Sequence, residues 1–99
     1  MIELNAPNIS KKEINLTSKA LNSGWVSDGV YIKLFEDKLK KYVKAKYAAS
    51  CINGTSALHL ALKIINANKD TEVLVPSVSF IATANAILYT GASPVFFWS

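Results

Sequence analysis

The chain has 99 residues, of which 51% are hydrophobic, so it is long enough for one small domain with a core and too apolar for a disordered protein. Its net charge of +4 comes from eleven basic residues, all of them lysine, against seven acidic residues. Because arginine is absent, bidentate recognition of phosphates or guanine is not expected, and we expect no nucleic-acid partner.

Two helices are predicted in the first half of the chain. Ser10 and Glu13 match a capping box, and the helix that follows is expected over residues 11–22, with Gly24 placed to end it. An amphipathic helix is predicted over residues 31–44, because its apolar residues recur at helical spacing. Its clustered lysines follow two acidic residues, which is typical of a solvated helix face.

Strands and helices alternate in the second half of the chain. Such an alternation predicts parallel strands with right-handed crossovers, and Ser79 and Gly91 are expected to cap and to end the second helix. Ligands of such folds bind beyond the carboxyl ends of the strands, where the loops 53–56 and 76–80 are expected. The predicted strands cover residues 46–52, 72–75 and 94–98, and the predicted helices cover residues 55–66 and 80–89.

Residues 73–99 carry no charged side chain, a length that invites a membrane-spanning interpretation. Pro76, Gly91 and Pro94 interrupt this run, so buried strands and a helix explain it better. We therefore expect no membrane partner, and a membrane-associated peptide is a minor alternative. With a single cysteine, Cys51, and no signal-peptide pattern, the expected location is the cytoplasm.

The turn Asn53-Gly54-Thr55-Ser56 is the candidate binding site. Asn53 and Gly54 tolerate positive φ, and Thr55 and Ser56 supply hydroxyls at a helix start, where unpaired N–H groups favour a phosphate. The turn lacks the signatures of a P-loop and of a dinucleotide-binding loop, so these residues alone favour an ordinary capped connection. A free-standing small α/β module that binds a phosphorylated ligand is one functional alternative.

Five motifs then occur in a distinctive order. They are Leu-Asn-Ser-Gly-Trp-Val-Ser-Asp-Gly at residues 21–29, Phe-Glu at 35–36, Asn-Gly-Thr-Ser-Ala-Leu-His-Leu-Ala-Leu at 53–62, the segment 72–87, and Gly-Ala-Ser-Pro-Val-Phe at 91–96. In this order they resemble the amino-terminal part of the DegT/DnrJ/StrS family of pyridoxal-phosphate-dependent sugar aminotransferases. The pattern is nearest to members that aminate nucleotide-linked keto-sugars for surface glycans.

The resemblance implies an α/β fold, the N-terminal portion of a fold type I transferase large domain. Two helices in an N-terminal segment, residues 1–45, would precede a βαβαβ arrangement with parallel strands in residues 46–99. In the family, strands encoded later lie between the first strand and the second. The sheet is therefore expected to be incomplete, and its exposed edges and uncharged end predict instability or aggregation.

The resemblance also implies a cofactor site for pyridoxal 5'-phosphate. Gly54, Thr55 and Ser56 would hold its phosphate, and Phe80 would lie against one face of its pyridine ring. Without the resemblance, Phe80 would be a core residue at the start of a helix.

Three further residues, Trp25, Ser27 and Gly29, would line the substrate entrance. Trp25 alone also fits a hydrophobic plug over the end of the first helix. His59 is expected to be a packed helix residue rather than a proton carrier, because no acidic partner is evident near it.

The chemistry of the family also requires a lysine that forms a Schiff base with the cofactor and a carboxylate at the pyridine nitrogen. In the family both lie beyond the point that residue 99 reaches, so no catalytic residue is assigned, and no metal ligand either. The family continues Pro-Val-Phe with an acidic pair, whereas this chain reads Phe97-Trp98-Ser99. We expect a fragment, or a frameshifted or prematurely stopped product, that is inactive alone. The complete enzyme would commonly use glutamate as amino donor and form a homodimer.

Overall fold

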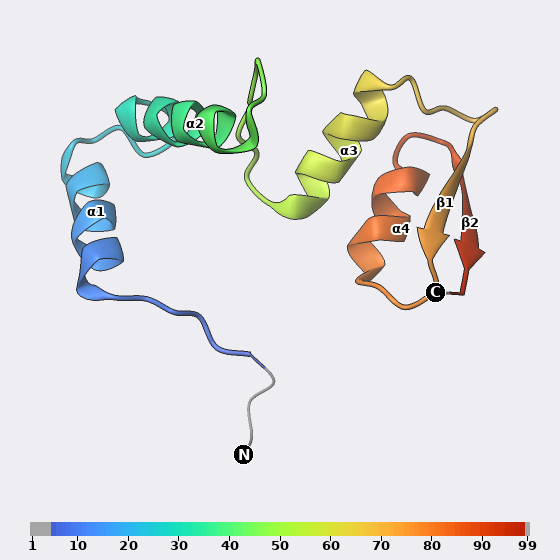
Figure 1. The fold of residues 1–99 in the computed structure, drawn as a ribbon, viewed down its shortest axis with the longest axis horizontal. Helices are drawn as coiled ribbons and strands as arrows, with labels where there is room; N and C mark the ends of the chain where they lie inside the picture. The colour runs from blue at the N-terminus through green and yellow to red at the C-terminus, as the bar shows by residue number, and fades with distance from the viewer. Residues whose placement is uncertain (1–4, 99) are drawn as a thin grey trace. The chain divides into compact units, whose positions relative to one another are not determined.

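The computed structural model describes residues 5–98. The chain divides into two compact units, residues 1–48 and residues 49–99, and each is described by itself (Figure 1). None of the helices among the described residues is long and apolar enough to cross a membrane.

The first unit holds the helices α1 (Lys11–Asn22) and α2 (Val30–Val43). The predicted capping box is present, since the Ser10 amide donates to Glu13 Oε2 at 2.7 Å and Ser10 Oγ accepts from the Lys12 amide at 3.2 Å. Gly24 follows the end of α1 with φ +75°, a left-handed conformation that glycine adopts without strain. The predicted boundaries of this first helix are therefore confirmed.

The second unit holds α3 (Gly54–Ile64), β1 (Glu72–Pro76), α4 (Ile81–Leu88) and β2 (Ser93–Phe97). The strands β1 and β2 are parallel neighbours with Glu72 opposite Ser93, and α4 connects them as the predicted crossover helix. Gly91 has φ +85° and ends the α4 segment as expected.

The core of the second unit is small. Val75 is 1% exposed and Ile87 is 2% exposed, and these two side chains pack with Ala67 and Ala92. Leu62 of α3 and Val73 of β1 pack against this cluster while remaining partly exposed. The core therefore lies mainly between α4 and one face of the two strands.

The predicted strand over residues 46–52 is wrong, because these residues are irregular and Ile52 is 93% exposed. A strand forms only beside a partner, and the described sheet contains β1 and β2 alone. The small apolar residues of this segment suit a buried strand, but composition alone supplies no hydrogen-bonding neighbour. The parallel pair joined by a helix is confirmed, and the full βαβαβ arrangement is not.

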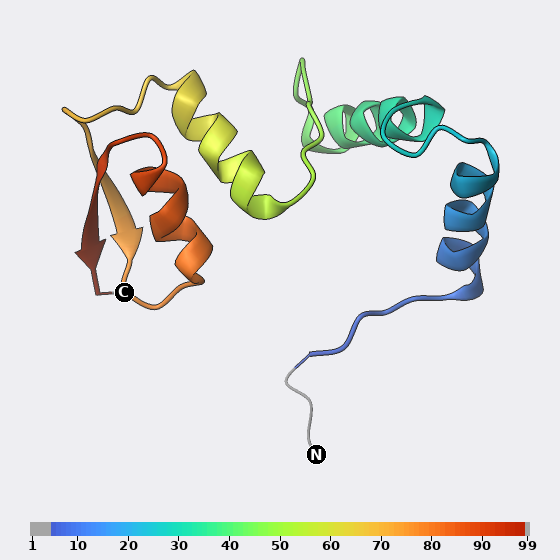
Figure 2. The same ribbon diagram turned by 180° about the vertical axis from the view of Figure 1, so that it is seen from behind.

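The carboxyl ends of β1 and β2 lie at the same end of the second unit as the amino ends of α3 and α4 (Figures 1 and 2). Both loops predicted to bind a ligand, residues 53–56 and 76–80, lie at this end. The predicted cap at Ser79 is wrong, since α4 has Phe80 at its N-cap position without a side-chain cap, and Ser79 Oγ instead donates to the Phe80 carbonyl at 3.3 Å.

Candidate functional site

The first turn of α3 is built around the side chain of Asn53. Asn53 is the N-cap residue, with φ −158° and ψ 172°, and its Oδ1 accepts from the Ser56 amide at 2.9 Å. Asn53 and Gly54 tolerate positive φ, but the turn does not use it, because the extended cap residue already orients the chain into the helix. Sequence reasoning assigned the capping to hydroxyls and missed this amide side chain.

Two amides of this turn are left for a ligand. The Ala57 amide donates to the Asn53 carbonyl at 3.1 Å. Within residues 5–98, by contrast, the amides of Gly54 and Thr55 donate to no protein acceptor. Unpaired amides at the start of an eleven-residue helix carry a partial positive charge that attracts anions.

The surroundings of these amides leave room for a phosphate group. A Cβ atom placed on Gly54 would meet nothing within 4 Å, so the chain is uncrowded on that side of Gly54. Thr55 and Ser56, both half-buried, bring two hydroxyl groups into the same turn. Two amide donors, two hydroxyls and an uncrowded approach fit the phosphate of pyridoxal phosphate.

Phe80 stands at the amino end of α4 and is 87% exposed. This exposure excludes the interpretation of Phe80 as a core residue at a helix start. The aromatic ring is thus free to lie against a planar ligand, and both its helix and α3 begin at the same end of the unit (Figures 1 and 2).

His59 lies one helical turn beyond Thr55 and packs edge-on against Tyr89. The ring centroids are 5.7 Å apart at an interplanar angle of 64°. The His59 Nε2 atom is buried and has no hydrogen-bond partner within the described chain. A packed helix residue, as expected, is the role that this environment supports.

The lysines of the second unit lie away from the turn at residues 53–56. Lys63 follows Thr55 by eight residues along α3, which corresponds to about 12 Å along the helix axis. The Lys69 backbone nitrogen lies 3.6 Å from the Cβ position of Gly91, beyond the carboxyl end of α4. Neither lysine is placed so that its amine could react with a cofactor ring that stacks on Phe80.

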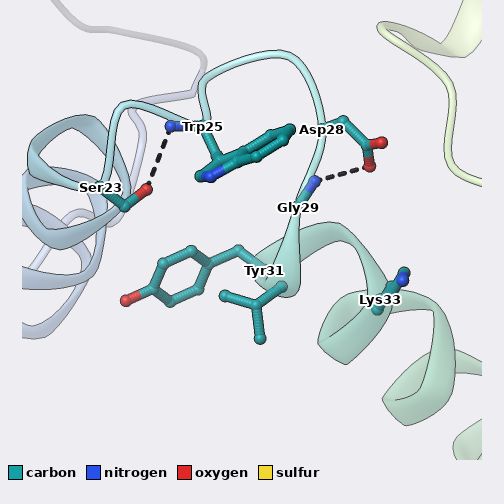
Figure 3. Close-up of a pocket in the computed structure, with 7 residues that line it drawn as sticks. Ser23, Trp25, Asp28, Gly29, Tyr31 and Lys33 are labelled. Carbon is teal, nitrogen blue, oxygen red and sulfur yellow. Dashed lines mark hydrogen bonds between the residues drawn. The ribbon is translucent and has the colours of Figure 1, made fainter.

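A separate pocket of about 380 Å³ lies in the first unit, between the end of α1 and the start of α2 (Figure 3). Two of the three predicted substrate residues, Trp25 and Gly29, line it, and Ser27 does not. Figure 3 shows the Trp25 indole from the loop above the ring of Tyr31 from the first turn of α2. The full lining is Ser23, Trp25, Asp28, Gly29, Val30, Tyr31 and Lys33.

Gly29 shapes this pocket. Its φ is +121°, and a Cβ atom on it would lie 3.1 Å from the Cβ of Trp25. The Gly29 amide also donates to Asp28 Oδ1 at 2.6 Å. Sequence reasoning missed Tyr31 and Lys33 as pocket residues. The only feature of the sequence that could have indicated them is their position in the first turn of α2, directly after Asp28-Gly29.

Comparison with known proteins gives this geometry a context. A model of the DegT/DnrJ/EryC1/StrS aminotransferase family matches residues 7–97. GDP-perosamine synthase of Escherichia coli O157:H7 is 43% identical over 91 residues, which are 91% of this chain and 25% of that protein. The spore coat polysaccharide biosynthesis protein SpsC of Bacillus subtilis is 41% identical over 90 residues, 91% of this chain and 23% of that protein.

A solved structure shares the fold. The PLP form of the putative sugar aminotransferase Spr1654 from Streptococcus pneumoniae matches 96% of this chain with a TM-score of 0.87 and 30% sequence identity, and the match covers 24% of that protein. The chain thus spans about a quarter of the length of the proteins it resembles.

Proposed function

The chain belongs to the DegT/DnrJ/EryC1/StrS aminotransferase family, and we propose that it supplies the phosphate-binding part of an enzyme that aminates a nucleotide-linked keto-sugar. In the complete reaction an amino group, donated by glutamate, replaces the carbonyl oxygen of the sugar. Relatives named for GDP-perosamine and for spore coat polysaccharide support a role in surface polysaccharide synthesis. Members of this family depend on pyridoxal phosphate, which supplies an electron sink for amine transfer when it is bound.

The observation that carries this proposal is the first turn of α3. The free amides of Gly54 and Thr55 would donate to the phosphate oxygens, and the hydroxyls of Thr55 and Ser56 would complete the contacts. The ring of Phe80 would stack on the planar end of the same molecule. Offset stacking of this kind contributes about 0.5–1.5 kcal/mol beyond the burial of its area.

The chain holds and orients the cofactor but does not carry out the transfer. Lys63 and Lys69, the lysines of the second unit, lie away from the turn at residues 53–56. We propose that the reactive lysine and the carboxylate at the ring nitrogen come from other polypeptide, as the resemblance to the family implies. We propose that the complete enzyme is a homodimer and that the 99 residues alone are inactive. Trp25 and Gly29 line the pocket of the first unit, and we propose that this pocket contacts the substrate.

The alternative of a free-standing phosphate-binding module gains no support from the sheet. Two strands with one small core lie below the three or more strands that usually give a sheet independent stability.

The experiment compares pyridoxal phosphate with pyridoxal, which lacks the phosphate. Binding to the 99-residue chain is measured by isothermal calorimetry or by the shift in melting temperature. We expect pyridoxal phosphate to bind more tightly, inorganic phosphate to compete, and Ser56→Ala to weaken binding by about tenfold to a hundredfold, the effect of losing one hydrogen bond to a charged group. Ser18→Ala on α1 is the matched control and should change nothing. Equal binding of the two compounds, or equal effects of the two variants, would refute the proposed site.

A further inference from the structure

The net charge of the chain is concentrated in its first unit. Residues 1–48 hold nine of the eleven lysines and five of the seven acidic residues, so their net charge is +4, whereas residues 49–99 carry no net charge. A positive field of this kind raises the local concentration of anionic ligands. The pocket in the first unit should therefore favour a ligand that carries negative charge.

Two aromatic rings border this pocket. Trp25 lies in the loop after α1 and is 69% exposed, and Tyr31 lies in the first turn of α2, below the indole in Figure 3. Among residues 5–98 the one pair of aromatic rings in contact is His59 with Tyr89. The rings of Trp25 and Tyr31 are therefore not stacked on each other, and both are available to a planar ligand.

Hydrogen bonds hold the loop that carries Trp25. Ser23 Oγ accepts from the Trp25 amide at 3.3 Å and donates to the Ala20 carbonyl at 2.6 Å (Figure 3). At the other end of the loop, Asp28 Oδ1 accepts from the Gly29 amide. The loop is thus positioned before a ligand arrives, which lowers the entropy that binding would cost.

The charged side chains of the pocket suit the polar parts of a nucleotide. The Asp28 carboxylate has about four acceptor positions, of which the Gly29 amide uses one. Guanine offers such a carboxylate two neighbouring N–H donors, at N1 and at its amino group, whereas adenine presents an acceptor at N1. Lys33 forms no ion pair within the part of the chain that the structure describes, so its ammonium group is available to a diphosphate.

The size of the pocket also fits a small molecule. Its volume of about 380 Å³ lies in the range of roughly 300–1,000 Å³ that small-molecule sites occupy. Such sites combine apolar or aromatic walls with a few polar groups that fix the orientation of the ligand. The rings of Trp25 and Tyr31, together with Asp28 and Lys33, give this pocket that composition.

We propose that this pocket binds the nucleotide part of the substrate and selects guanine as its base. Trp25 and Tyr31 stack on the base, Asp28 accepts its two N–H donors, and Lys33 pairs with the diphosphate. The inference rests on the proposed function for the expectation that the substrate is a nucleotide-linked sugar. It adds to that function a preference for one base and the residue that sets it, Asp28.

The test measures the binding of GDP, ADP and pyrophosphate to the 99-residue chain by isothermal calorimetry. We expect ADP to bind about tenfold more weakly than GDP, because it has a similar stacking surface but not the two donors. Pyrophosphate should also bind about tenfold more weakly, because it has no base to stack. GDP should quench tryptophan fluorescence, and Trp98→Phe should retain the quenching, since Trp98 lies in the second unit. No pyridoxal phosphate is added, so cofactor binding does not affect these results.

The decisive variant is Asp28→Asn. It keeps an oxygen that can accept from the Gly29 amide, so the loop retains its fold, but it replaces the other oxygen by a donor. We expect the preference for GDP over ADP to disappear. Trp25→Leu should weaken GDP and ADP alike by about tenfold and leave pyrophosphate unchanged. Lys33→Gln should weaken GDP and pyrophosphate alike by about threefold, whereas Lys38→Gln, on the same helix outside the pocket, should change neither.

Four results would overturn the inference. They are equal binding of GDP and ADP, binding of pyrophosphate as tight as that of GDP, a preference for GDP that survives Asp28→Asn, and quenching that Trp98→Phe abolishes. Any of these with a preserved preference for pyridoxal phosphate over pyridoxal would refute the nucleotide pocket alone. Equal binding of pyridoxal phosphate and pyridoxal, with the preference for GDP intact, would instead refute the phosphate-binding turn alone.

Discussion

Asn53 Oδ1 and the Ser56 amide, 2.9 Å apart, close the first turn of α3 and leave the two amides between them unpaired. The side chain of Asn53 therefore caps the helix and leaves the amides of Gly54 and Thr55 without an acceptor in residues 5–98. The cap satisfies one orphan donor of the helix start, and a phosphate can satisfy the others.

Loss of this cap should destabilise the second unit. We expect Asn53→Ala to lower the free energy of unfolding by about 1 kcal/mol, because the Ser56 amide loses its acceptor. Asn53→Asp, which keeps the acceptor, should retain most of the stability. Urea unfolding followed by circular dichroism measures both, and equal losses in the two variants would show that the side-chain oxygen is not what matters.

Substitution by alanine should change stability in opposite directions at two glycines. Gly29→Ala should destabilise the first unit by about 1 kcal/mol or more, because its φ of +121° is strained for alanine and the new Cβ lies 3.1 Å from Trp25 Cβ. Gly54→Ala meets open space at ordinary helical geometry, so it should be neutral or stabilising by about 0.4–1 kcal/mol. Trp25 fluorescence during unfolding reports the first change, and circular dichroism reports the second.

The same Gly54→Ala variant should weaken the binding of pyridoxal phosphate, since its methyl group occupies the approach to the free amides. Stability gained together with affinity lost is the expected combination. A variant that binds the cofactor as well as the original chain would show that the phosphate does not approach at Gly54.

The helix α1 should lose stability in acid. The hydrogen bonds from Ser10 lower the pKa of Glu13, and the nearby Lys12 lowers it further. Because the folded pKa is depressed, the stabilisation is complete above the ordinary glutamate pKa of about 4.3 and disappears as the pH falls through the lower folded value. Circular dichroism at 222 nm between pH 7 and pH 2 should show this loss.

Glu13→Gln should remove that part of the acid response while retaining an acceptor for the cap. The acid response that is due to Asp37 should persist in this variant and serves as the internal control. The pKa of Asp37 is also lowered, by the hydrogen bond from Lys40 at 2.7 Å. An acid transition of the same size in Glu13→Gln and in the original chain would assign the effect to other groups.

Pyridoxal phosphate should form no stoichiometric covalent bond with this chain. Borohydride reduction followed by mass spectrometry should find only scattered, substoichiometric adducts on exposed lysines, because Lys63 and Lys69 lie away from the phosphate-binding turn. A single lysine modified to completion, and protected by Ser56→Ala from modification, would mean that the chain carries its own reactive amine.

Sequence reasoning succeeded where the signal is local. The capping box of Ser10 and Glu13, the left-handed Gly24 and the parallel pair around α4 all depend on neighbours within a few turns of chain. It failed for residues 46–52, because a strand depends on a partner that local composition does not specify. The sheet in residues 5–98 consists of β1 and β2.

In the candidate site, too, local sequence predicted some features, and others required the three-dimensional structure. The helix start at residues 53–56 was predictable from turn chemistry, but the choice of Asn53 as cap over the hydroxyls of Thr55 and Ser56 required the backbone geometry. Tyr31 and Lys33 reach their pocket only through the turn that Gly29 makes, so no spacing rule in the sequence links them to Trp25.

The two-stranded sheet has a consequence for the behaviour of this chain in solution. Leu74 of β1 is 72% exposed and Phe96 of β2 is 57% exposed, so apolar side chains of both strands face water. Exposed apolar strands associate between molecules, so turbidity should rise with protein concentration.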